Sequence, residues 1–387
     1  MRNVAITLLV VFIFVIPTEK ILVVDPIGSI GRIIGILTML VWVAAVLLEG
    51  GVRSLKPFHI CFLLFILWNA ASIFWTIDED ATLERISTWF QLGILVILIW
   101  DLLTNRTLLK TGMQAFVAGA LVAACGIIFN FINSTEFVYG RYSAGGQHAV
   151  NLGLMMAIGL PMAWYLILDN QIEDRFLKWF KWLNILFFPI VGIAIALTGS
   201  RGAMIAAFPA IIFILSTASR LPLWAKLASA IAACGGIYVA LLIVPESLFR
   251  RLGSAYTELQ TGGSLTGRTQ IWSDATNRFL DNPILGVGSN AFKSISEHGL
   301  VVHNSFLSVF VETGILGGLL FLTTIALALL TVLSLPKLES RLWLAVFFAW
   351  FLGASALTFE HQKTTWLVLA LMAAAMVLAQ RNRANEH

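Results

Sequence analysis

Apolar segments long enough to cross a membrane recur along the whole chain and are separated by short polar turns. A helix needs about 20 predominantly apolar residues to span a bilayer, and the pattern predicts twelve such helices. The predicted spans are 4–17, 30–48, 58–76, 86–103, 112–133, 149–168, 183–198, 202–218, 224–243, 304–333, 341–358 and 364–380. The first run lacks a cleavage site of small residues, so we interpret it as a span and not as a signal peptide. The tenth run is too long for one crossing, which predicts that part of it projects beyond the membrane.

One long polar excursion, residues 244–303, separates the ninth and tenth spans. Within it, 247–260 and 268–280 carry apolar residues at helical spacing with charged residues between them. This pattern is typical of amphipathic helices that lie on a membrane surface or over a cavity. Gly262-Gly263-Ser264 separates the two as a turn.

Composition agrees with this picture. Hydrophobic residues make up 59% of the chain and charged residues 12%, against about 25% charged residues in soluble domains. We therefore expect an all-α polytopic membrane protein in which residues 1–387 form a single integral membrane domain. The basic residues are scattered among loops, so nucleic-acid binding is not supported. The three cysteines lie in apolar runs without metal-ligand spacing, and there is no phosphate-binding loop or dinucleotide fingerprint, so no cofactor is expected.

Orientation follows from the basic residues of the short loops. One set of loops holds fourteen of them: Arg2, Arg53, Lys56, Arg106, Lys110, Arg175, Lys178, Lys181, Arg220, Lys226, Lys337, Arg341, Arg381 and Arg383. The opposite set holds six: Lys20, Arg32, Arg85, Arg141, Arg201 and Lys363. This asymmetry predicts that both termini are cytoplasmic and that the 244–303 loop faces outward.

His303 is the first candidate for chemistry. It lies where the tenth span begins, next to Asn304, and Ser308 and Glu312 follow at four-residue steps, so one helical face is polar within an apolar segment. Intramembrane ionisable groups are costly and usually mark a site. A histidine there suits a general base, although an interfacial histidine with a structural hydrogen bond remains the alternative.

Two arginines are candidate anion ligands. Arg201 lies in a tight glycine-flanked turn at the start of the eighth span, and Arg268 lies at the start of the second amphipathic segment, where Thr266 can act as the cap. A helix N-terminus attracts anions, and a guanidinium binds phosphate through two hydrogen bonds. A membrane-anchoring role for Arg201 and a solvated side chain for Arg268 are the alternatives.

Weaker candidates lie on the same side of the membrane. Arg141, next to Tyr139, has aromatic flanks that suit a sugar ring, but interfacial tyrosines are common. Glu360, His361 and Lys363 lie between the last two spans, and each alone favours a structural role. The cluster Asp78-Glu79-Asp80 is better explained as an ordinary solvated outer loop than as a cation site, and no other sequence pattern indicates a metal.

Three separated motifs now coincide: Gly199-Ser200-Arg201-Gly202, Gly267-Arg268 with Trp272, and His303-Asn304 followed nine residues later by Gly314-Ile315-Leu316-Gly317. In their order and sidedness they resemble the O-antigen ligase and O-antigen polymerase family of bacterial inner-membrane glycosyltransferases, which are of the GT-C type. Residues 147–151, Gln-His-Ala-Val-Asn, depart from the Pro-Asn pair of many relatives, so the resemblance assigns that segment no role.

The resemblance implies a metal-independent transferase with its active site facing the periplasm. Its donor would be an undecaprenyl-pyrophosphate-linked glycan and, for a ligase, its acceptor a sugar hydroxyl of lipid A-core. Arg201 and Arg268 would hold the pyrophosphate, His303 would assist the acceptor hydroxyl, and Asn304, Arg141 and Tyr139 would bind substrate. The His-Asn and Gly-x-x-Gly spacing favours the ligase. A polymerase, a protein O-oligosaccharyltransferase, and a flippase or transporter for the same lipid-linked glycan remain alternatives.

Overall fold

The computed structural model describes residues 1–19, 23–24, 28–138, 140–168, 175–246, 248 and 268–385. Helices dominate this part of the chain. They are α1 (Arg2–Val15), α2 (Ile30–Glu49), α3 (Pro57–Ala71), α4 (Glu79–Leu102), α5 (Arg106–Ile132), α6 (Ala149–Leu168), α7 (Arg175–Leu197), α8 (Arg201–Thr217), α9 (Leu223–Ile243), α11 (Arg268–Asp281), α12 (Phe292–Ile295), α13 (Ser305–Leu333), α14 (Lys337–Ala354) and α15 (Lys363–Asn385), with short 3-10 turns η1 (Ile16–Thr18), η2 (Ser72–Phe74) and η3 (Ala218–Arg220). Two antiparallel pairs of two-residue strands complete it, β1 (Val23–Val24) with β2 (Gly28–Ser29) and β3 (Phe137–Val138) with β4 (Arg141–Tyr142).

Each of the twelve predicted spans coincides with one of these helices. Within the described residues, eight helices are long and apolar enough to cross a membrane, and three shorter apolar helices accompany them. The all-α polytopic membrane architecture is thus confirmed. The number of twelve crossings and their direction stay predictions.

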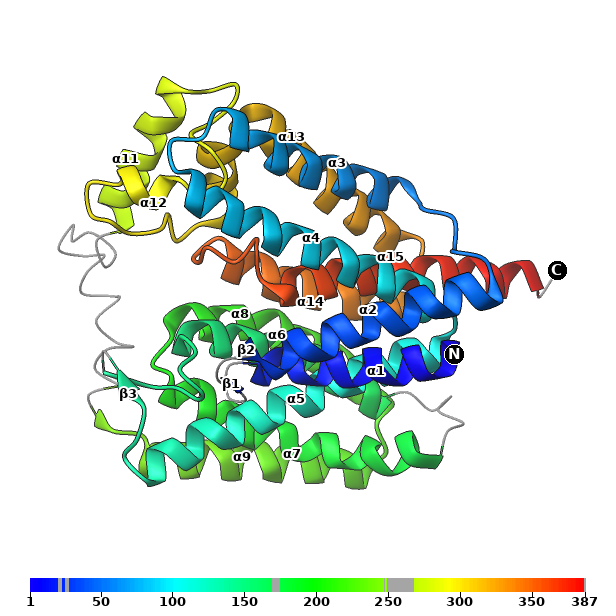
Figure 1. Ribbon diagram of the computed structural model, residues 1–387. Coiled ribbons are helices and arrows are strands. Elements are labelled where there is room, and N and C mark those ends of the chain that lie inside the picture. Colours follow the sequence, from blue (N-terminus) through cyan, green and yellow to red (C-terminus); the bar gives the residue numbers. More distant parts are fainter. Residues whose placement is uncertain are drawn as a thin grey trace.

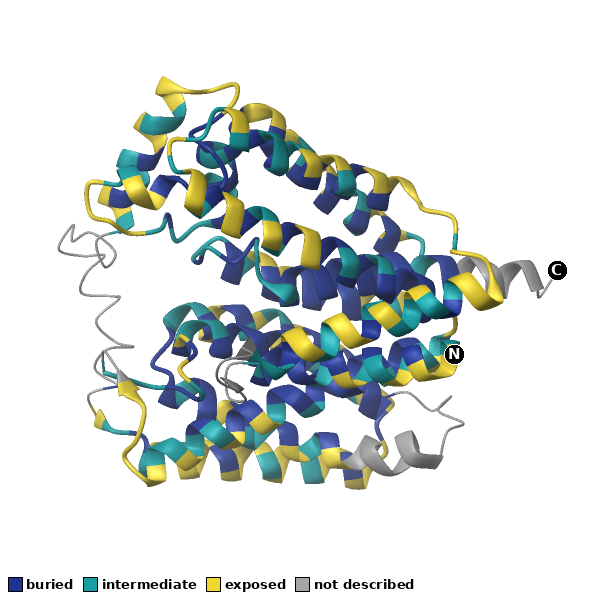
Figure 2. Cartoon of the chain, viewed as in Figure 1, coloured by how far each residue is buried: buried dark blue, intermediate teal, exposed yellow. Residues whose placement is uncertain are grey.

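The helices form a bundle in which both described chain ends lie at one end, while α11 and α12 lie at the other (Figure 1). Burial is greatest in α6 and α15, whose ribbons are largely dark blue (Figure 2). In α6 every residue except Val150 and Asn151 is buried, because α5, α7, α8 and α14 all pack against it. The hydrophobic core therefore runs along the middle of the bundle.

The start of α4 gives Asp78-Glu79-Asp80 a role at a helix N-terminus, while Glu79 and Asp80 are exposed to solvent, as predicted. The Asp78 side chain accepts a hydrogen bond from the backbone N–H of Ala81 at 3.0 Å and so caps the helix. Glu79 and Asp80 occupy its first turn, where negative charge is favourable to the helix dipole. This explains why α4 begins seven residues before the predicted span at 86.

The long helix α13 is interrupted at Gly314, whose φ of 66° and ψ of −171° are not helical. The loop that follows α11 fills the interruption. The N–H groups of Val287 and Gly288 donate to the carbonyls of Val311 (3.0 Å) and Glu312 (2.9 Å), and the N–H of Ile315 donates to Pro283 (2.8 Å). The loop thus satisfies backbone groups that the break in α13 would otherwise leave unpaired.

Helix α11 confirms the second predicted amphipathic segment. Its buried residues Ile271 and Ala275 belong to a small apolar cluster that also contains Phe292, Val302 and Val311. This cluster attaches α11 to the first half of α13. The first predicted amphipathic segment, 247–260, lies outside the described residues except for Leu248.

Candidate anion and proton-transfer site

Arg201 is positioned by the turn between α7 and α8. Gly199 has a φ of 55°, a conformation that favours glycine. The buried Ser200 caps α8 by accepting a hydrogen bond from the N–H of Ala203 at 3.2 Å. Arg201 is therefore the first residue of a capped helix, where the helix dipole also favours an anion.

Arg268 has the corresponding position on α11, as its first residue. Burial, together with the positive charge of Arg201, lowers the pKa of Arg268. The two arginines, 67 positions apart in sequence, are thus close enough for the charge of one to act on the other. Thr266 and Gly267, the expected cap and turn residues, lie outside the described residues. A dianionic ligand would offset the repulsion between the two positive charges.

His303 lies two residues before the start of α13, and two hydrogen bonds fix the backbone at His303 and at the residue before it. Its N–H donates to the Thr358 hydroxyl at 2.9 Å, and the indole N–H of Trp272 on α11 donates to the adjacent Val302 carbonyl at 3.0 Å. Its φ of 55° is unusual for a residue other than glycine. Such backbone strain persists where the surroundings fix it and is concentrated at functional sites.

The electrostatic surroundings of His303 favour its neutral form. Burial lowers the pKa of His303, and the charges of Arg268 and then His148 lower it further. A neutral imidazole can accept a proton. The charge of Arg268 thus acts on His303, and the charge of Arg201 acts on Arg268. These effects link the three residues into one candidate site.

Sequence reasoning missed His148 as a neighbour of His303. It lies just before α6, in the segment that departs from the Pro-Asn pattern. That departure was the only available signal, because nothing in the local sequence connects residue 148 with residue 303.

A buried ion network supports the site from the α14–α15 loop. Glu360, only 2% exposed, lies 3.2 Å from His361 Nδ1 and 3.9 Å from Arg85. Burial opposes ionisation of Glu360, but the hydrogen bond and charge of His361, and then the charge of Arg85, lower its pKa. Arg85 also donates to Asn290, and the Glu360 carboxylate accepts the Ser308 hydroxyl at 3.5 Å. This network joins α4 to α13 close to His303.

The remaining predicted residues have different positions. The Asn304 side chain caps α13 by accepting from the N–H groups of Phe306 and Leu307, at 3.0 and 3.1 Å. Arg141 lies in β4, against β3 and α5, and Tyr139 lies outside the described residues. Substrate binding by these three residues stays a prediction. Within the described parts of the chain, no three histidine, cysteine or carboxylate side chains form a group suited to a metal ion.

The fold and the site together define a class: a polytopic α-helical membrane protein with two arginines at helix N-termini beside a histidine. Residues 185–322, which include all three, match the protein family described as O-Antigen ligase. The chain is also 23% identical, over 282 residues, to an O-antigen ligase of Pseudomonas aeruginosa. That alignment covers 70% of this chain and 64% of the relative, slightly less than two thirds of its length. These matches confirm the resemblance to the O-antigen ligase family that the three motifs predicted.

Proposed function

We propose that the protein is an O-antigen ligase of the bacterial inner membrane, with its active site facing the periplasm. It transfers a glycan from undecaprenyl pyrophosphate to a sugar hydroxyl of lipid A-core. The observation that carries the proposal is the grouping of Arg201, Arg268 and His303 within the segment that matches the family.

Arg201 and Arg268 bind the donor pyrophosphate in this scheme. Each is the first residue of a helix, so guanidinium hydrogen bonds and the helix dipoles act on the same anion. As the bond between the anomeric carbon and the pyrophosphate oxygen breaks, negative charge grows on the leaving group. The two arginines stabilise that charge in the transition state.

His303 accepts the proton of the acceptor hydroxyl as its oxygen forms the new bond to the anomeric carbon. The lowered pKa of His303 keeps the imidazole unprotonated near neutral pH, which a general base requires. Undecaprenyl pyrophosphate leaves without needing a proton, and His303 later releases its proton to water.

Reconstitution tests the proposal. Purified protein is given lipid-linked glycan and lipid A-core, and joined product is measured together with donor binding. His303→Ala should lose product by about a hundred- to ten-thousand-fold while still binding donor, because the arginines are unchanged. His298→Ala, an exposed histidine of the same loop, is the matched control and should transfer normally.

The same assay separates the alternatives. Lengthening of the glycan without lipid A-core identifies a polymerase, and movement of the lipid-linked glycan across the bilayer without a new bond identifies a transporter. Loss of donor binding together with transfer in His303→Ala contradicts the role assigned to His303.

A further inference from the structure

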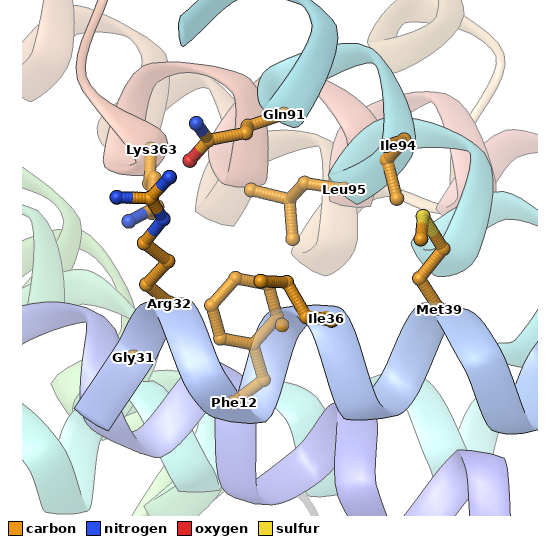
Figure 3. Close-up of a pocket in the computed structure, with 10 residues that line it drawn as sticks. Phe12, Gly31, Arg32, Ile36, Met39, Gln91, Ile94, Leu95 and Lys363 are labelled. Carbon is orange, nitrogen blue, oxygen red and sulfur yellow. The ribbon is translucent and has the colours of Figure 1, made fainter. Parts of the chain in front are cut away.

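An apolar groove with a cationic end lies between α1, α2 and α4. Its volume is about 120 Å³. Arg32 and Lys363 lie together at one end, whereas Phe12, Leu95 and Met39 line the part farther along α2 and α4 (Figure 3). Arg32 and Met39 are seven residues apart on one helix, so the groove extends about 10 Å along it.

The groove is open to the surroundings of the bundle through α2. Only Gly31, Thr38 and Ala45 are buried on that helix, and Ile36, which lines the groove, is 49% exposed. In a membrane, the exposed face of α2 meets lipid. A hydrocarbon chain can therefore enter the groove sideways from the bilayer.

A polar chamber of about 220 Å³ adjoins the cationic end, since Lys363 and Gln91 line both cavities. Gln147, His148 and Gln362 contribute further polar groups to it. Amide side chains both donate and accept hydrogen bonds, which matches the hydroxyl groups of sugars. The chamber also meets the loop that holds the candidate base, because His361 and Gln362 line it and Thr358 of the same loop accepts a hydrogen bond from the His303 N–H.

The charges at the junction favour an anion. Lys363 forms an ion pair with Glu19, so these two charges offset each other. Arg32 then provides the net positive charge of the group formed by Glu19, Arg32 and Lys363. Arg32 lies in the first turns of α2, the outer end of that helix in the predicted orientation, where lipid phosphates lie. Apolar groove, cation and polar chamber thus follow one another in the order of the tail, phosphate and sugars of a phosphorylated glycolipid.

We propose that the groove and chamber bind the acceptor glycolipid, lipid A-core. One acyl chain lies in the groove, a phosphate contacts Arg32, and core sugars extend through the chamber toward His303. This rests on the proposed function. The acceptor fits better than the donor because none of the described residues that line the chamber belongs to α8 or α11, the helices that begin with Arg201 and Arg268. The two substrates then reach His303 from different sides.

The experiment measures binding and does not depend on turnover. Purified protein is titrated with photoactivatable lipid A-core and, separately, with lipid-linked donor. Ile36→Trp fills the groove and Arg32→Glu reverses its charge. Arg32→Glu should weaken acceptor binding about tenfold or more, the effect of losing a charge-assisted contact. Ile36→Trp should weaken acceptor binding by occupying the space of the acyl chain, and both variants should leave donor binding unchanged. Leu37→Trp is the control, because Leu37 is the adjacent residue, is 46% exposed and does not line the groove.

Each other outcome overturns the inference. Unchanged acceptor binding in both variants means that the groove holds bulk lipid or nothing. Weakened donor binding instead means that it holds the prenyl chain. If wild-type protein makes joined product while the variants bind acceptor normally, the proposed function stands and this inference fails. If wild-type protein binds acceptor through the groove but makes no product, the glycolipid site stands and the proposed function fails.

Discussion

Replacing Gly314 by alanine should destabilise the protein strongly, although the change adds only one methyl group. The backbone of Gly314, with φ 66° and ψ −171°, occupies a region open essentially to glycine alone, and another residue there costs about 1–3 kcal/mol. An added Cβ would also lie 2.1 Å from the carbonyl oxygen of Ile284. The loop must then move, which breaks the bond from Ile315 N–H to Pro283 and costs about 0.5–1.5 kcal/mol more. We expect a total loss of about 1.5–4.5 kcal/mol.

Thermal unfolding in detergent, followed by tryptophan fluorescence, measures the effect. Gly235→Ala is the matched control, because a Cβ at Gly235 in α9 meets nothing within 4 Å and alanine is the better helix former by about 1 kcal/mol. The control should unfold at or above the wild-type temperature and Gly314→Ala well below it. Equal unfolding temperatures for the two variants would refute the argument that the loop and the break in α13 fix each other.

Three further predictions concern the site. Arg201→Lys and Arg268→Lys should each reduce transfer roughly ten- to a hundred-fold, because lysine keeps the charge but loses the planar two-pronged contact; wild-type rates in both would leave the arginines as anchors. Because the pKa of His303 is lowered from 6.5, transfer should persist at pH 6.5 and fall only at more acidic pH, as His303 becomes protonated; a pH–rate profile that already falls above pH 6.5 contradicts the assigned base. Transfer in excess EDTA should equal the untreated rate, because the arginines supply the charge that stabilises the leaving group; magnesium-dependent recovery from EDTA would reject this mechanism.

The helices were predictable because membrane spans are marked by local composition alone. The candidate site was predictable in part, since Arg201, Arg268 and His303 each lie at a helix start on the same predicted side of the membrane. The three residues can lie close together only if they are on the same side of the membrane, and the basic residues of the loops predict that they are. The length of the tenth run predicted only that part of it projects beyond the membrane, and it did not predict the break in α13 at Gly314.

Contacts between segments that are distant in the chain could not be predicted from the sequence. The ion network joins Arg85 to Glu360 across 275 positions in the chain. The local sequence around either residue does not indicate a contact with the other. The same is true of His148 and His303. The start of α4 was misplaced for a different reason: Asp78 was interpreted by its charge and not by its ability to cap a helix.

The burial of α6 has a consequence for how the protein is made. During synthesis α5 precedes α6, and α7 and α8 follow soon after, but α14 begins at Lys337, well over a hundred residues later. Until α14 has been inserted, the face of α6 that it covers must meet lipid or a partner of the insertion machinery. Ribosome-bound chains that end before Lys337 should therefore leave this face of α6 accessible to crosslinkers carried on lipid tails, and chains that extend beyond Ala354 should protect it.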